Sequence, residues 1–95
     1  MDRIILHCSY TRENGDPREF AYEMQNSGLQ AEVKAEEGCI EYDYYAPLDG
    51  SDKVLLVEGW QNDELLERHK NSDIMAKIRA LKDEMGIITN IERFD

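Results

Sequence analysis

The 95-residue sequence predicts a single α+β domain, residues 1–95, with the ferredoxin-like element order β-α-β-β-α-β. Three observations support this fold class. Alternating residues over 4–10 and a tyrosine-rich run over 39–46 are typical of strands. An Asp-Gly turn then separates the second strand from an apolar run over 53–61. A helical stripe follows, and a last strand is expected over 87–94, which gives a four-stranded antiparallel sheet.

The first strand divides its side chains between two faces, because successive residues of a strand point to opposite sides of the sheet. One face carries Ile4, Leu6, Cys8 and Tyr10, and the other carries Ile5, His7 and Ser9. The next helix is expected to begin at Pro17, with Asp16 as N-cap and Glu19 completing a capping pattern. Since Gly28 interrupts the apolar stripe of this helix, we expect a kink or a break near it.

The second half contains clear start and stop signals. Gly38 ends the first helical region, and the strand that follows is expected to place Ile40, Tyr42 and Tyr44 on one face. Asn62 is a candidate cap for a short helix that runs to about residue 70. Ser72 caps the last helix, and Gly86 suits the left-handed position after its end. The core stripe of that helix is Ile74, Ile78, Leu81 and Met85.

A sheet covered by helices on one side leaves its other face open. The apolar residues of the first and third strands are too numerous to remain in water. A second copy of the chain, packed sheet against sheet, is the simplest cover. The sequence therefore predicts a homodimer.

The composition excludes several classes of partner. With 11 basic and 21 acidic residues the net charge is −10, which disfavours nucleic acid and anionic membrane surfaces. No apolar run approaches the ~18 residues of a membrane span, and the first residues lack the layout of a signal peptide. The expected location is therefore the cytoplasm. Cys8 and Cys39 lack the spacing of a zinc site, and no phosphate-binding loop is present, so no metal or cofactor is predicted.

Three segments together resemble a known family. They are residues 36–42 (Glu-Glu-Gly-Cys-Ile-Glu-Tyr), 58–63 (Glu-Gly-Trp-Gln-Asn-Asp) and 66–69 (Leu-Glu-Arg-His), followed by Ser72. In these segments the chain resembles the antibiotic biosynthesis monooxygenase superfamily of dimeric α+β barrels. The resemblance implies the fold and the dimer. That superfamily includes cofactor-independent quinol and polyketide monooxygenases, haem-degrading enzymes and an isomerase of a phosphorylated signal, so it leaves the reaction open.

Two branches of that superfamily fit less well. The Ser/Thr-Pro-His turn of the isomerase branch is Ser72-Asp73-Ile74 in this chain, so its histidine is absent. The haem-degrading branch uses an asparagine and an axial histidine, whose positions fall at His7 and Arg79. Only its tryptophan, at Trp60, matches.

His69 and Trp60 are the candidate catalytic residues. His69 could act as a general base toward a phenol or enol, or it could be a half-buried structural histidine. Trp60 could form a flat wall for an aromatic substrate, or it could anchor the following helix in the core. His7 could contact a substrate oxygen if its face of the first strand is the helix side.

Further candidates would line a substrate pocket. Tyr42 and Tyr44 could be pocket walls or ordinary strand packing. Leu66 and Met75 complete the candidate substrate-binding set, although a methionine at helical spacing also suits a core. Glu58 is interpreted as structural, paired with Arg or Lys across the dimer. The acidic run at 36–37 and the charged face of the last helix are interpreted as solvated surface.

The favoured function is a cofactor-independent monooxygenase that oxidises an aromatic, quinol-like small molecule with dioxygen. Deprotonation of a phenol raises its electron density enough to reduce dioxygen, so the protein needs only a base and a dry apolar slot. Two alternatives remain: a proton-transfer isomerase of a small hydroxy-ketone, and a dimer that binds a small molecule without catalysis.

Overall fold

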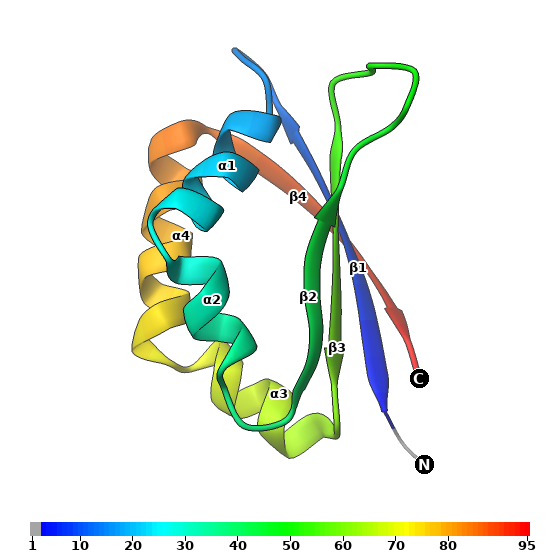
Figure 1. Cartoon of the computed structure of the whole chain (residues 1–95), viewed down its shortest axis with the longest axis vertical. Helices are drawn as coiled ribbons and strands as arrows, with labels where there is room; N and C mark the ends of the chain where they lie inside the picture. The colour runs from blue at the N-terminus through cyan, green and yellow to red at the C-terminus, as the bar shows by residue number, and fades with distance from the viewer. Residues whose placement is uncertain (1–2) are drawn as a thin grey trace.

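The computed structural model describes residues 3–95 and confirms the predicted α+β fold class. Four strands form one antiparallel sheet in the order β2-β3-β1-β4. The elements are β1 (Ile4–Arg12), α1 (Arg18–Asn26), α2 (Leu29–Lys34), β2 (Cys39–Tyr45), β3 (Val54–Trp60), α3 (Asp63–Lys70), α4 (Asp73–Met85) and β4 (Ile87–Phe94). All four helices lie on the same side of the sheet (Figure 1). No helix within residues 3–95 is both long and apolar enough to cross a lipid bilayer.

The core lies between the helices and one face of the sheet. The register of β1 against β3 places Ile4 opposite Trp60, Leu6 opposite Glu58 and Cys8 opposite Leu56. The inward residues of both strands are buried, as the alternation in the first strand predicts. The largest fully buried side chains on this face and on the helices above it are Trp60, Tyr10, Tyr42, Phe20, Met24, Leu56, Leu66 and Ile78.

Local capping chemistry fixes the helix ends in the second half of the chain. The Asn62 side chain accepts a hydrogen bond from the backbone N–H of Leu65 at 2.9 Å. The Ser72 hydroxyl accepts one from the N–H of Met75 at 3.1 Å. Gly86 has φ 66° at the end of α4. The three predicted signals are therefore confirmed.

The first helical region breaks at Gly28, as predicted, because this residue has φ 86° between α1 and α2. The predicted capping pattern at its start is only half right. Asp16 accepts a hydrogen bond from the N–H of Arg18 at 2.9 Å. Glu19, however, forms an ion pair with Arg12 of β1 and makes no reciprocal capping contact.

The prediction that Ile40 shares a face with Tyr42 and Tyr44 is wrong, because β2 contains a bulge. The pairing with β3 shifts between Cys39 and Glu41, so Ile40 is the extra residue. Its Cβ lies near Gly59 on the open face of the sheet, and the side chain is 46 % exposed. Tyr42 and Tyr44, by contrast, point toward the helices.

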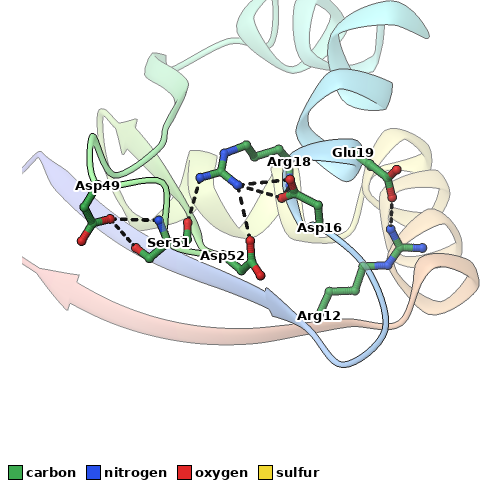
Figure 2. Close-up of polar contacts among 7 residues, drawn as sticks. All are labelled: Arg12, Asp16, Arg18, Glu19, Asp49, Ser51 and Asp52. Carbon is green, nitrogen blue, oxygen red and sulfur yellow. Dashed lines mark hydrogen bonds and ion pairs between the residues drawn. The ribbon is translucent and has the colours of Figure 1, made fainter.

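Arg18 attaches the hairpin between β2 and β3 to the start of α1 (Figure 2). Its guanidinium donates to both carboxylate oxygens of Asp16 at 3.1 Å and to the carbonyl oxygen of Ser51 at 2.8 Å. Asp52 lies 3.7 Å away, and Asp49 closes the hairpin by accepting from Ser51. One cation therefore holds a loop that has no regular secondary structure of its own.

Gly38 is required by its surroundings as well as by its backbone. It has φ 85°, and a Cβ placed there would lie 2.7 Å from Cβ of Leu65 in α3. Its carbonyl oxygen accepts a hydrogen bond from the N–H of Gln61 at 2.9 Å. The turn into β2 can therefore approach α3 only because this residue has no side chain.

We predict that Gly38→Ala destabilises the protein more than Gly28→Ala does. Both positions have nearly the same φ, so both substitutions share a backbone penalty of ~1–2 kcal/mol. Only position 38 adds a clash with Leu65, because a Cβ at position 28 meets no atom within 4 Å. The expected difference is about 1–3 kcal/mol in the free energy of unfolding, measured by urea denaturation. Equal values would show that α3 moves away without strain.

The open face of the sheet is apolar and has no helix against it. Ile5, His7, Leu55 and Val57 lie at its centre and are partly exposed. The larger apolar side chains around them are about half exposed, namely Ile40, Tyr45, Ile88 and Phe94. Polar side chains of the outer strands, those of Asp43, Asn90 and Glu92, border this apolar patch. An uncovered apolar patch of this kind is unusual on a monomer.

We propose that a second copy of the chain covers this face. Light scattering is expected to give about twice the 11.1 kDa mass of one chain. Leu55→Lys places a charge at the centre of the face and should yield the monomer mass. Leu48→Lys is the matched control, since Leu48 is fully exposed in the hairpin loop and should leave the mass unchanged. A monomer mass for the unaltered protein at micromolar concentration would contradict the proposal.

Candidate active site

His69 occupies the last turn of α3 and faces the sheet. It follows Leu65 and Leu66 at helical spacing, so all three side chains share the buried side of this short helix. Only 3 % of His69 is exposed. Its ring stacks on the indole of Trp60, with ring centroids 4.6 Å apart and an angle of 27° between the planes. Its Nδ1 lies 2.9 Å from Oε2 of Glu36.

The contact with Glu36 fixes how His69 can act. When Glu36 is ionised, its carboxylate only accepts hydrogen bonds, and Nδ1 is then the ring nitrogen that donates to it. Nε2 then holds the free lone pair, and it makes no hydrogen bond to residues 3–95. A carboxylate behind a histidine also stabilises the imidazolium that forms when Nε2 takes a proton. The pair therefore has the geometry that an oriented general base requires.

Glu58 holds Trp60 from the strand side. Oε1 of this buried carboxylate accepts the indole N–H of Trp60 at 3.0 Å. Oε2 accepts the thiol of Cys8 at 3.4 Å. The prediction that Glu58 has a structural role fits these contacts, but its partners lie within the chain and are neither Arg nor Lys. Burial, followed by the negative charge of Glu58, raises the pKa of Cys8 to about 12, so the thiol remains a protonated donor.

A cavity of about 320 Å³ opens beside His69, between α4 and the strands β1, β3 and β4. Its size lies at the lower end of the ~300–1,000 Å³ typical of small-molecule sites. Most of the lining is apolar, with charged groups at a few points. The lining residues are Leu6, Cys8, Glu58, Leu66, His69, Lys70, Met75, Arg79, Lys82, Thr89 and Ile91.

The prediction that the charged face of α4 is solvated is wrong for Lys82. Its side chain lines the cavity and its ammonium lies 4.7 Å from the ring centroid of Tyr10. Burial lowers the pKa of Lys82, while the negative charge of Glu58 opposes this shift. Arg79 lies one turn earlier and donates to the carbonyl oxygen of Lys70 at 2.6 Å.

The structure brings some of the predicted site residues together. Leu66 and Met75 line the cavity, and Trp60 lies directly behind His69. Tyr42 is buried in the core, and its ring lies at 68° to that of His69 with centroids 6.1 Å apart. Tyr44 instead lines a separate cavity of about 170 Å³ between β2 and α1.

His7 lies on the open face of the sheet, opposite Leu6 and Cys8. Its ring packs against Phe94 of β4 with centroids 4.8 Å apart. His7 therefore does not share a cavity with Trp60, because its face of the first strand is not the helix side and the sheet separates the two side chains. Any contact of His7 with a substrate would have to come from that other face.

Sequence reasoning missed two residues of this site. The sequence predicts that Glu36 belongs to an exposed acidic run, but it is largely covered and lies in contact with His69, 33 positions later. The sequence likewise predicts that Lys82 lies on a solvated face. Its spacing did carry a signal, because Met75, Arg79 and Lys82 follow each other at i, i+4 and i+7 on one side of α4. Within residues 3–95, no group of three His, Cys, Asp or Glu side chains could hold a metal ion.

Comparison with known proteins assigns the chain to a family. The model of the antibiotic biosynthesis monooxygenase family matches residues 6–81, which run from β1 through most of α4 and include Glu36, Trp60 and His69. The chain belongs to this family. The resemblance seen in the sequence is therefore confirmed. No curated protein matches the chain significantly.

Solved structures share the fold across the whole chain. A conserved protein of Bacteroides thetaiotaomicron, described as a possible oxidoreductase, is 25% identical and has a TM-score of 0.82, with 97% of this chain and 95% of that chain covered. A conserved protein of Methanosarcina mazei is 26% identical, with a TM-score of 0.81 and coverage of 97% and 90%. SnoaB of Streptomyces nogalater, a cofactor-independent oxygenase, is 13% identical, with a TM-score of 0.83 and coverage of 100% and 93%.

We predict that Glu36→Ala destabilises the protein more than the adjacent Glu37→Ala does. Removing Glu36 leaves the buried Nδ1 of His69 without its partner, which is expected to cost about 1–3 kcal/mol. Glu37 forms only an exposed ion pair with Arg68, so its loss should change stability by less than ~1 kcal/mol. Urea denaturation at neutral pH measures both. Equal costs would show that the Glu36 contact adds nothing to folding.

Proposed function

We propose that the chain is a cofactor-independent monooxygenase that oxidises an aromatic, quinol-like small molecule with dioxygen. Family membership supports monooxygenase chemistry at a general level. The observation that carries the proposal is the buried His69, whose Nδ1 is held by Glu36 and whose ring borders an apolar cavity. This arrangement supplies a base and a place for a flat substrate.

His69 begins the reaction by taking a proton from a phenolic hydroxyl of the substrate onto Nε2. Glu36 then faces an imidazolium and stabilises its charge, as a carboxylate does behind other catalytic histidines. The stacked indole of Trp60 keeps the ring in this orientation. Glu36 and Trp60 are thus positioning residues, and His69 is the catalytic residue.

The phenolate supplies all the electrons that dioxygen requires. It transfers one electron to dioxygen, and the two radicals combine to form a carbon–oxygen bond. The peroxide anion that results takes the proton back from His69 and becomes a hydroperoxide. Loss of water from the hydroperoxide leaves a carbonyl group. For a hydroquinone the sum is hydroquinone plus dioxygen giving hydroxyquinone plus water. The substrate loses four electrons, one oxygen atom enters the ring, and the other leaves as water.

The apolar lining suits this sequence of steps. Leu6, Leu66, Met75 and Ile91 border the cavity and limit the water that could protonate the carbanionic carbon or the peroxide. A slot near 320 Å³ accommodates a small aromatic molecule.

A proton-transfer isomerase is the second candidate, and one observation favours it. Arg79 and Lys82 border the same cavity, form no ion pair within residues 3–95, and could bind the phosphate of a small hydroxy-ketone. Such an enzyme would use His69 as its base and would consume no dioxygen. Oxygen uptake therefore separates the two functions.

We predict that His69→Ala lowers dioxygen uptake by ~100-fold or more, because it removes the general base. The measurement is oxygen consumption by metal-stripped protein over a panel of hydroquinones and polyphenols. Arg68→Ala is the matched control, since this neighbour on α3 is exposed and lies outside the cavity. Added imidazole should restore part of the lost rate.

Thermal unfolding of each variant confirms that it is folded. Uptake by the unaltered protein that does not exceed autoxidation would overturn the monooxygenase proposal. Full activity in the folded His69→Ala variant would remove this residue from the role of base.

A further inference from the structure

We propose that the ligand of the cavity beside His69 is an aromatic molecule that carries an anionic group, a carboxylate or a phosphate, bound by Lys82 with Arg79. This inference rests on the proposed function only in placing the reacting hydroxyl of the ligand at His69. It narrows the substrate from a neutral quinol to a charged one.

The charges around the cavity are opposite in sign to those of the chain. The whole sequence has a net charge of −10, yet Lys70, Arg79 and Lys82 all border this one cavity. Lys70 is paired with Glu67 at 3.4 Å, whereas Arg79 and Lys82 form no ion pair within residues 3–95. Among the described residues, Glu58 supplies the only carboxylate of the lining, and both of its oxygens accept hydrogen bonds from other side chains. The cavity is thus a local positive region that would attract an anion.

Lys82 has no anionic partner of its own. Its ammonium forms no ion pair or hydrogen bond with the residues that the structure describes, 3–95, and rests over the ring of Tyr10. The ionisable groups that face it are Cys8, Glu58, Tyr10 and Arg79. A partly desolvated cation in this setting gains from a bound anion, because the anion replaces the water that burial removed. Lys77 of the same helix is exposed and lies outside the lining.

The cavity separates the anion site from the base by about the length of one substituted ring. His69 lies beside the start of α4, since the Ser72 hydroxyl contacts both its carbonyl oxygen, at 2.7 Å, and the N–H of Met75, at 3.1 Å. Lys82 follows Met75 by seven residues, or ~10 Å along a helix. Apolar side chains line the space between these ends, among them Leu66 and Ile91. A ring with a hydroxyl at one end and an acid at the other fits this order.

The test compares an acid with its amide, which differ in charge but hardly in shape, and adds a phosphate ester as a second anion. Binding of 2,5-dihydroxybenzoate, 2,5-dihydroxybenzamide and 4-hydroxyphenyl phosphate is measured by calorimetry under anaerobic conditions, so that no turnover occurs. The unaltered protein is expected to bind the benzoate ~10-fold or more tightly than the amide, since a charge-assisted hydrogen bond replaces a neutral one. Tighter binding of the phosphate would identify a phosphomonoester as the preferred anion.

Lys82→Met should remove the preference for the acid and leave the affinity for the amide unchanged. Lys82→Arg should keep the preference because it keeps the charge, and Lys77→Met is the matched control on the same helix. Equal binding of acid and amide, a preference that survives in folded Lys82→Met, or no binding of any of the three ligands would overturn the inference. Oxygen uptake is scored separately: an anion preference without uptake would overturn the monooxygenase function and leave this inference standing.

Discussion

The buried indole of Trp60 is the contact on which the rest of this structure depends. It closes β3, lies opposite both Ile4 and Cys39 in the sheet, and is fully excluded from solvent. Its N–H is bonded to Glu58 and its face is stacked on His69. The side chain of Trp60 therefore connects the sheet to α3. Its N–H has a hydrogen-bond acceptor and its ring is buried, so both its polar and its apolar parts are accommodated. The same packing that completes the core also orients the histidine.

The two faces of the sheet differ in what they contain. The helix side contains the core, the cavity and the polar groups that contact His69 and Trp60, whereas the other side has an uncovered apolar patch. Because side chains alternate along a strand, adjacent residues such as Leu6 and His7 belong to different environments. A shift of one residue in the register of β1 would exchange these environments and destroy both surfaces together.

Local signals made most of the fold predictable, and long-range contacts limited what could be said of the site. Asn62, Ser72 and Gly86 act through hydrogen bonds and dihedral angles within one turn, so their roles can be derived from neighbouring residues. The bulge at Ile40 depends on how β2 meets β3, which no local pattern specifies. The contact of Glu36 with His69 joins residues that only the finished fold brings together, and the same holds for the burial of Lys82.

The order of strands in the sheet has a consequence for how the chain folds. β1 lies between β3 and β4, and its Leu6 pairs with Glu58 on one side and Arg93 on the other. The strand that comes first in the chain thus has no hydrogen-bonding partner until about fifty further residues are available. Folding dominated by such distant pairings is slow, because a long loop must close before any contact forms. At a synthesis rate of ~5–20 residues per second, β1 would remain unpaired for seconds. A chaperone could shield its exposed edges during this period.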